Sequence, residues 1–383
     1  MARPSVVILG AGFGGLAAAH ALRREAGDEV DLLVVDQSPT FLMGLRKLWF
    51  LDGRASPGEG GRDRSALPRA GIPFRQGTAE SIDRDARRVR VDGEDIGYDF
   101  LVVALGAQQR IDLVPGEPDG NPNLYTVEGA AEGGRRLREL EEGRVVIAIA
   151  GVPYRCPPAP YEAAFLIDDL LRRDGRRDRV ELEVLTPQPM SVPAAGPAAC
   201  AAIEGRLSKK GIGFRPKTHL AEVRAGMLSL EGGDTARGDL VLMVPPHRPP
   251  MVVDESGLVG ESGWIKADPG TLRTEDERIF AVGDVVEMST GTGLPFPKAG
   301  VFAESHGEVV GRNLAAVVES REPDATFDGF GYCFLEVGEG RASMVRGNFL
   351  ASPPNVRIEE DAPEHLEAKQ EFERERLDRW FPS

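Results

Sequence analysis

The residues best suited to chemistry in this sequence lie in the segment YRCPPAPYE, where Cys156 stands beside prolines and Glu162 follows. A thiolate is a nucleophile, and a cysteine held in a disulfide accepts attack by another sulfur nucleophile. We expect the adjacent Arg155 to favour the thiolate form of Cys156. Glu162 is a candidate proton acceptor or donor because an apolar, partly desolvated site raises the pKa of a carboxyl group. Alternatively, Glu162 only complements the dipole of the following helix from its first turn.

The element that carries Cys156 has the pattern of a nucleotide-binding unit without its glycines. The apolar run RVVIAIA predicts a strand that enters a turn at Gly151, and a helix follows. The next strand, VELEVLT, ends at Thr186 rather than at a carboxylate that could hold a ribose. Prolines lack the backbone N–H groups that bind pyrophosphate, and four stand here: Pro153, Pro157, Pro158 and Pro160. A nicotinamide nucleotide is therefore a poor candidate for the electron donor.

A second unit, at the start of the sequence, has the complete pattern. In SVVILGAGFGGLAAAHALRR an apolar strand precedes Gly10-x-Gly12-x-x-Gly15, and an alanine-rich helix follows. The next apolar run, VDLLVVD, ends at Asp36, which can accept hydrogen bonds from a ribose hydroxyl. The glycines permit a tight turn and close approach of a pyrophosphate to the helix N-terminus. This unit predicts dinucleotide binding.

Two further segments favour FAD as the dinucleotide. A strand from Ile279 to Val282 leads to Gly283 and Asp284, whose carboxylate can accept bonds from ribityl hydroxyls. The run YDFLVVALGA predicts another strand that leaves the first domain at Gly106. In this order the segments resemble the FAD-binding pattern of flavoproteins with two dinucleotide-binding domains. The predicted FAD-binding residues are Gly10, Gly12, Gly14, Gly15, Asp36, Gln37, Ala79, Ala104, Gly106, Gly283, Asp284 and Lys298.

The cysteine segment itself resembles a known active site. YRCPPAPYEAAF closely resembles that of the flavoprotein subunit of flavocytochrome c sulfide dehydrogenase and, less closely, that of sulfide:quinone oxidoreductases. The family takes a second cysteine from its C-terminal domain, and GYCFLEVGEGRASMV supplies Cys333 in a matching context. Two more segments resemble the family: the Pro-Lys-x-Gly segment at Pro297, Lys298 and Gly300, and VPPHRPPMVVDESGL around His247.

The resemblance implies a reaction. Hydrosulfide would attack a redox disulfide between Cys156 and Cys333, and two electrons would pass to FAD and then to a quinone or another acceptor. Lys298 would lie near the pyrimidine end of the flavin and favour its anionic reduced form. Glu162 would accept or donate the protons of the reaction. Met43 stands where covalent relatives have the FAD-linking cysteine, so we expect non-covalent FAD. Two alternatives stay open: an NAD(P)H-dependent quinone or ferredoxin reductase of the same superfamily, and a flavin-binding redox sensor.

Composition narrows the class of protein. The formal net charge is -15 and no basic cluster is visible, which argues against a nucleic-acid partner. No apolar run approaches the roughly 20 residues that cross a bilayer. The three cysteines are too scattered for a zinc site or a secreted disulfide framework, and Cys200 has the context of a buried apolar residue. Because the first strand begins so early, we expect a cytoplasmic protein, with peripheral contact to the inner face of the membrane left open.

These elements predict an α/β fold with two Rossmann-like domains and a small C-terminal α+β domain. We expect a discontinuous FAD-binding domain at residues 1–106 and 270–315, a second Rossmann-like domain at 107–269, and a C-terminal domain at 316–383. The last domain would carry Cys333 and end in a strongly charged helix. Trp380 and Phe381 at its end are either a weak membrane anchor or a cover over the domain. The oligomeric state stays undetermined.

Overall fold

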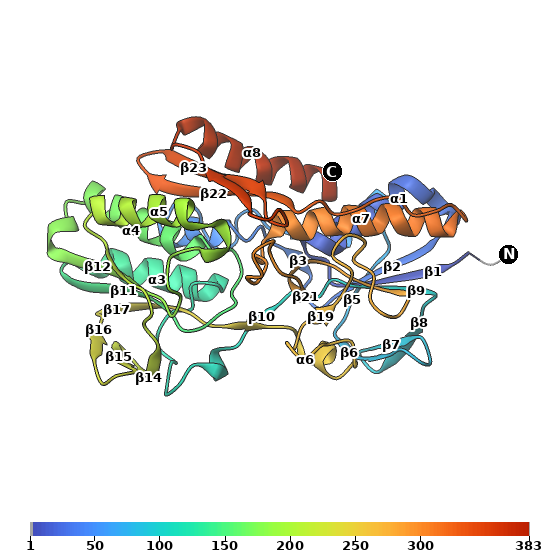
Figure 1. The fold of residues 1–383 in the computed structure, drawn as a ribbon, viewed down its shortest axis with the longest axis horizontal. Coiled ribbons are helices and arrows are strands. Elements are labelled where there is room, and N and C mark those ends of the chain that lie inside the picture. The colour runs from blue at the N-terminus through green and yellow to red at the C-terminus, as the bar shows by residue number, and fades with distance from the viewer. Residues whose placement is uncertain (1–2, 383) are drawn as a thin grey trace.

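The first lobe, at the right of Figure 1, is built on a five-stranded sheet. The computed structural model describes residues 3–382. The strand order is β20-β9-β1-β2-β5, and every pairing is parallel. Apolar runs such as that of β1 are buried on both faces, as parallel sheets require. The strands are β1 (Ser5–Leu9), β2 (Asp31–Asp36), β5 (Phe74–Gln76), β9 (Phe100–Val103) and β20 (Ile279–Ala281).

Two helices, α1 (Phe13–Ala26) and α7 (Gly300–Val318), pack closely against each other in this lobe. Glycines permit the contact: a Cβ atom on Gly307 would lie 2.2 Å from the backbone oxygen of Gly14. A Cβ on Gly311 would likewise meet the α1 backbone at 2.6 Å, at the oxygen of Ala18. This close packing fixes the start of α7 beside the turn between β1 and α1.

The second lobe, at the left of Figure 1, contains a four-stranded parallel sheet of order β13-β12-β11-β17. The cysteine-bearing unit predicted from the sequence is the pair β11 and α4 of this lobe. The strands and helices are β11 (Gly143–Ile149), β12 (Val180–Leu185), β13 (Gly213–Arg215), β17 (Leu240–Val244), α3 (Val127–Glu139), α4 (Ala159–Arg173) and α5 (Pro197–Lys209).

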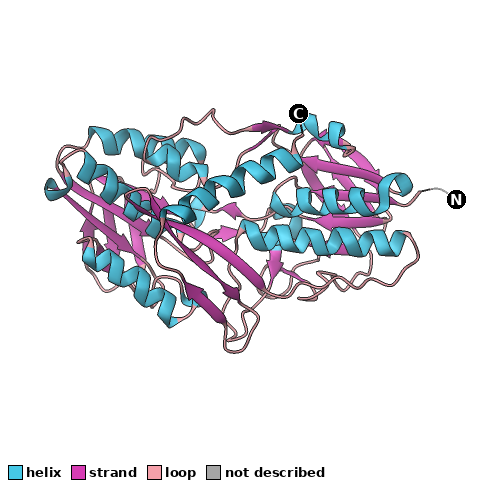
Figure 2. Cartoon of the chain, turned by 90° about the horizontal axis from the view of Figure 1, so that it is seen from above, coloured by secondary structure: helices cyan, strands magenta, loops and turns pink. Residues whose placement is uncertain are grey.

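A third layer consists of an antiparallel sheet and the charged C-terminal helix. It lies along the top of the molecule in Figure 1 and toward the viewer in Figure 2. β22 packs against α4 of the second lobe, and the same strand also contacts α7 of the first. This layer therefore touches both lobes near the cysteine segment. Its elements are β22 (Phe330–Gly338), β23 (Arg341–Asn348), β24 (Asn355–Ile358) and α8 (Pro363–Trp380).

The remaining elements are short. They include two antiparallel three-stranded sheets, one on each lobe, and a two-stranded pairing of β10 with β18 between the lobes. No helix among residues 3–382 is long and apolar enough to cross a membrane. The remaining short strands and helices are β3 (Thr40–Phe41), β4 (Arg62–Asp63), β6 (Ala79–Asp83), β7 (Arg88–Val91), β8 (Glu94–Gly97), β10 (Gln108–Gln109), β14 (Leu220–Arg224), β15 (Met227–Leu230), β16 (Thr235–Arg237), β18 (His247–Arg248), β19 (Ile265–Lys266), β21 (Val286–Glu287), α2 (Arg46–Leu51) and α6 (Met251–Asp254).

The predicted strand-turn-helix units and the charged terminal helix are all present, and the predicted α/β fold class is confirmed by the two parallel sheets with their helices. The first sheet takes strands from residues 5–103 and then one more from 279–281, so the chain leaves it and returns. The exact domain limits at 106, 269 and 315 stay predictions.

Candidate functional site

The turn between β1 and α1 has the geometry of a phosphate cradle. Gly10 has a φ of 100°, and a Cβ on Gly15 would lie 1.8 Å from the oxygen of Gly10, so neither position tolerates a side chain. By contrast, apart from its two chain neighbours, no heavy atom of residues 3–382 lies within 4 Å of a Cβ built on Gly12. The first turn of α1 borders this open space. Gly14 faces the other way, toward Val282 and Ala303. The turn therefore fits the pyrophosphate of FAD.

Asp36 lies at the carboxyl end of β2, as predicted, but it already holds the turn itself. Its Oδ2 accepts a hydrogen bond from the N–H of Ala11 at 2.7 Å, and its Oδ1 accepts one from Ser38 at 2.8 Å. The buried Arg64 lies 3.4 Å from Asp36 Oδ1 and donates to the backbone oxygens of Ala11 and Thr40. Arg64 was not found from the sequence, and its role here is to fix the loop around the cradle.

The other predicted FAD-binding residues lie around the same sheet. Ala104 follows β9 and donates its N–H to Leu9 at 2.8 Å, and Gly106 has a φ of 64° just beyond it. Ala79 begins β6 and is half-buried, whereas Gln37 is exposed. All of these residues lie at or just beyond the carboxyl ends of the strands, where α/β sheets bind their ligands.

A second turn, after β20, carries Gly283 and Asp284. Gly283 has a φ of 77° and donates its N–H to Nδ1 of His306 at 3.2 Å. His306 is buried against Phe327, and burial lowers its pKa to about 3. His306 therefore supports this turn as a neutral side chain. Burial raises the pKa of Asp284, with Lys298 and Arg155 opposing the shift.

The Lys298 segment lies directly against the cysteine loop. The two segments pair at Arg155 and Lys298, and the N–H of Cys156 donates to the backbone oxygen of Lys298 at 2.6 Å. The ammonium of Lys298 donates to Val286 at 2.9 Å and stands 3.8 Å from the ring centre of Trp264. Burial lowers the pKa of Lys298 to about 8, although Asp284 opposes the shift. One cluster thus contains Cys156, Lys298 and Asp284.

Cys156 and Cys333 are both half-buried and both carry free thiols in this structure. Cys333 lies on β22, opposite Val345 of β23, and both cysteines pack against the same apolar core. Cys156 lies close enough to Cys333 for its charge to act on it. Burial raises the pKa of Cys333 first, and Cys156 and Glu162 add to this. The structure therefore brings together two cysteines that are far apart in the sequence.

The expectation that Arg155 makes Cys156 a thiolate is wrong. Burial raises the pKa of Cys156 to about 12, and Glu162 adds to this effect, while Lys369 opposes it. Desolvation of the anion outweighs the nearby positive charges. Cys156 has a φ of 48°, and its backbone oxygen accepts bonds from the Ala159 N–H at 2.8 Å and from the Tyr125 hydroxyl at 3.3 Å. The loop is thus firmly held.

Glu162 lies in the first turn of α4 and is buried, with 2% of its surface exposed. Its carboxylate binds the ammonium of Lys369 on α8, which also donates to Glu336 Oε1 of β22 at 2.8 Å. Arg54 lies 2.7 Å from the other oxygen of Glu336, and the indole of Trp49 donates to Glu336 at 2.7 Å. Burial raises the pKa of Glu162 to about 7, with Lys369 opposing the shift. A carboxyl group of this pKa can exchange protons at neutral pH.

Sequence reasoning missed the partners of these residues. Lys369 and Glu336 lie in segments that look like a charged surface helix and an ordinary strand. Lys47, on α2, is close enough to Arg155 and Cys156 for their charges to act on it, and burial lowers its pKa to about 8. Only the tertiary contacts identify these three residues, because no local motif marks them.

Three other residues singled out in the sequence have structural positions. Cys200 is buried in α5, as expected. His247 is fully buried; its Nδ1 accepts the N–H of Arg155 at 2.9 Å, and burial lowers its pKa to about 3. Trp380 is buried with its ring centre 5.3 Å from that of Phe13, so it packs over the FAD lobe.

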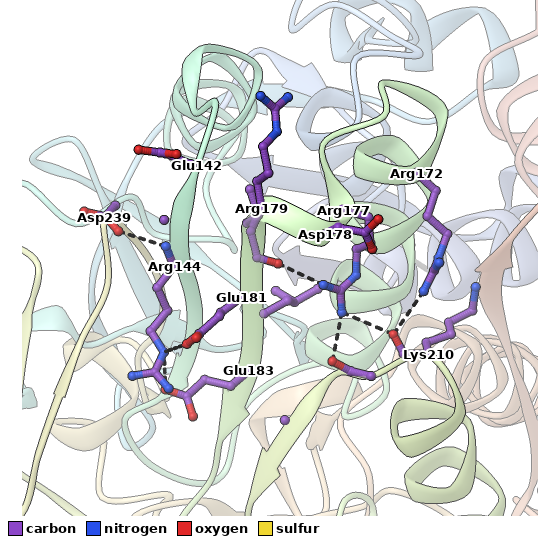
Figure 3. A pocket seen from close by; sticks show the side chains of 15 residues that line it. Glu142, Arg144, Arg172, Arg177, Asp178, Arg179, Glu181, Glu183, Lys210 and Asp239 are labelled. Atoms are coloured by element: carbon purple, nitrogen blue, oxygen red, sulfur yellow. Dashed lines mark hydrogen bonds and ion pairs between the residues drawn. The ribbon is translucent and has the colours of Figure 1, made fainter.

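A cavity of about 900 Å³ lies elsewhere, at the amino ends of β11, β12 and β13. Figure 3 shows Arg144 beside Glu181 at 3.1 Å, whereas Arg172 and Arg177 reach backbone oxygens. Arg177 binds the buried Asp168 at 2.6 Å. Ligands of parallel sheets bind at the opposite, carboxyl ends. This cavity is therefore separate from the cysteine cluster, and its charges neutralise one another.

Comparisons with known proteins agree with this geometry. Residues 4–303 match the family model described as pyridine nucleotide-disulphide oxidoreductase. The sulfide-quinone reductase of Aquifex aeolicus is 33% identical over 375 residues, covering 91% of this chain and 83% of the relative. The mitochondrial sulfide:quinone oxidoreductase of Mus musculus is 23% identical over 365 residues, covering 91% of this chain and 79% of the relative.

A solved structure, that of the sulfide:quinone oxidoreductase from Aquifex aeolicus, superposes with a TM-score of 0.88 and 23% identity. The superposition covers 98% of this chain and 91% of that one, and it supports the fold. FAD is the cofactor of this family, and the cradle at Gly12 fits it. The chain is an FAD-dependent oxidoreductase that belongs to the sulfide:quinone oxidoreductase family within the pyridine nucleotide-disulphide oxidoreductases.

Proposed function

We propose that this protein oxidises hydrosulfide through Cys156 and Cys333 and passes the electrons to a quinone. One observation carries the proposal: the second nucleotide unit presents a cysteine where its phosphate cradle would be. The backbone of that cysteine bonds to the Lys298 segment, and its thiol lies close enough to Cys333 and Glu162 for their charges to interact. The sulfide-quinone reductase of Aquifex aeolicus and the mitochondrial mouse enzyme support the choice of substrate and acceptor through their similarity to this chain.

The two thiols, once joined as a disulfide, supply the first step. Hydrosulfide attacks one cysteine sulfur, the disulfide breaks, and a persulfide forms on that cysteine while the other leaves as a thiolate. Because burial raises the pKa of both thiols, the leaving sulfur takes up a proton. Glu162, with a pKa of about 7, is suited to deliver it.

The second step regenerates the disulfide. A second hydrosulfide removes the persulfide sulfur, and the two cysteine sulfurs rejoin, releasing two electrons. In total, two hydrosulfide ions give one hydrodisulfide ion, one proton and two electrons. Bound FAD supplies the two-electron acceptor, and Lys298 would hold positive charge near it. Gly10, Gly12, Gly15 and Asp284 would bind this FAD without a covalent link, because the buried residue 43 is a methionine.

An anaerobic titration of the purified holoenzyme tests the proposal. We expect sulfide to bleach the flavin absorbance and NADH to leave it unchanged. A quinone analogue added afterwards should restore the oxidised spectrum. Bleaching by NADH alone would contradict the proposal and indicate an NAD(P)H-dependent reductase. Reduction by sulfide that survives Cys156→Ser would instead point to a flavin-binding sensor with no role for this cysteine.

A further inference from the structure

The buried ion cluster around Lys369 joins four parts of the chain. Glu162 comes from α4, Lys369 from α8, Glu336 from β22, and Arg54 from the segment after α2. Lys369 and both glutamates each expose 3% or less of their surface. Lys369 thus bridges two carboxylates that would otherwise face each other away from water.

The charges in this cluster fix where a proton goes. With Glu162, Glu336, Lys369 and Arg54 all ionised, two negative and two positive charges balance. Without Lys369, one carboxyl group must take up a proton, since two buried carboxylates cannot both remain charged beside a single cation. Arg54 contacts Glu336, so Glu336 keeps its charge and the proton goes to Glu162. Lys369 thus lowers the pH at which Glu162 loses its proton.

We propose that Lys369, on the C-terminal helix, is a positioning residue that holds the Glu162 carboxylate beside the cysteine pair in a form that can exchange a proton. This inference rests on the proposed function, because it assigns that proton to the cysteine chemistry. Glu162 interacts electrostatically with titratable or charged groups from every element packed around it. These groups are Lys369, Glu336, Arg54, Cys156, Cys333 and Tyr125.

The signs of these neighbours yield opposite expectations for two variants. Lys369 favours the ionised form of Glu162, so Lys369→Met should raise the midpoint of Glu162 titration by at least about 1 pH unit. Glu336 disfavours that form, so Glu336→Gln should lower the midpoint. Lys369→Arg keeps the positive charge and should leave the midpoint close to that of the wild type. Glu373→Gln is the matched control: it removes a buried ion pair between α8 and Arg46, outside this cluster.

The midpoint is measurable without sulfide. Infrared titration of the oxidised holoenzyme reports the protonated carboxyl band of Glu162, which Glu162→Gln identifies by its loss. An unchanged midpoint in Lys369→Met, or the same shift in Glu373→Gln, would overturn the proposal. If Lys369→Met does not fold or loses FAD, Glu336→Gln serves as the test. The absence of a downward shift in its Glu162 midpoint would contradict the proposal.

The rate of flavin reduction by sulfide connects the midpoint to chemistry. Glu162→Gln should remove one limb of the pH profile of this rate. In Lys369→Met and Glu336→Gln, that limb should shift together with the infrared midpoint, and in Glu373→Gln it should stay in place. Midpoints that move while this limb stays fixed would overturn the role in catalysis. A wild-type flavin that sulfide never reduces would instead contradict the proposed function, while the infrared shifts would still establish that Lys369 sets the charge of Glu162.

Discussion

The unit of β1 and α1 and the unit of β11 and α4 have the same topology, and their turns differ completely. Each begins with a buried apolar strand of a parallel sheet and continues into a helix. In the first, the turn is open around Gly12. In the second, the first helical N–H, that of Ala159, donates to the backbone oxygen of Cys156. Prolines 157, 158 and 160 have no N–H group that could bind a phosphate. The fold fixes the strand and the helix, whereas the turn decides which ligand the unit can hold.

The comparison also separates two roles of glycine. In the first unit a side chain at Gly12 would enter open space beside the helix N-terminus. In the second, a Cβ on Gly151 would lie 3.0 Å from Cβ of Pro246, which is a packing contact. The surviving glycine of the second unit therefore serves the packing of the loop rather than a phosphate.

The largest expected effect comes from removing the redox cysteine of the second unit. Cys156→Ser should slow sulfide-dependent flavin reduction by roughly a thousand-fold or more, since no other thiol can replace it in the loop. FAD content and thermal unfolding should stay close to wild type. Stopped-flow absorbance under anaerobic conditions measures the rate. Cys200→Ser, in α5 away from the cluster, is the control, and an equal loss in that variant would contradict the assignment.

A smaller effect should distinguish the two turns. Gly12→Ala places a methyl group where the pyrophosphate would lie, so FAD affinity should fall about ten- to a hundred-fold while the protein still folds. Gly151→Ala should leave FAD affinity unchanged. Fluorescence titration of the apoprotein with FAD measures both constants, and circular dichroism checks the fold. Equal losses in the two variants would mean that the units do not differ as described.

The smallest effect concerns Lys298, whose segment pairs with the cysteine loop of the second unit. Lys298 is charged below its pKa of about 8 and neutral above it, so flavin reduction should decline as the pH rises through about 8. Lys298→Met should lower the rate roughly ten-fold at neutral pH, and Lys298→Arg should move the alkaline limb upward. Lys47 has a similar pKa, and Lys47→Arg therefore tests which lysine causes the limb. A limb that moves only in Lys47→Arg would assign it to the other lysine.

The sequence predicted features that depend on local patterns. The glycine turn, the strand before Asp284, the proline-bound Cys156 and the position of Glu162 in a first helical turn all follow from residue order within about twenty positions. Lys369 and Lys47 were missed because their partners come from other elements. The charge of α8 looked like a solvated surface, yet Lys369 and Glu373 on it are buried in ion pairs.

The wrong expectation for Cys156 has a similar cause. A neighbouring arginine is visible in the sequence, whereas the burial that raises the thiol pKa exists only after α4, β22 and α8 have packed together. The desolvation contribution to a thiol pKa depends on the whole fold. A neighbour in the sequence therefore predicts the direction of one contribution to the pKa shift, and not the direction of the total shift.

The burial of Cys156 also affects how the reduced protein meets oxidants. Because burial raises the pKa of the Cys156 thiol to about 12, the thiol stays protonated at pH 7. Hydrogen peroxide reacts with thiolates, and repeated oxidation converts a cysteine irreversibly to sulfinic and sulfonic acids. The same packing that makes the thiol a slow nucleophile at rest therefore protects it from this damage, and the cysteine becomes reactive only through its disulfide.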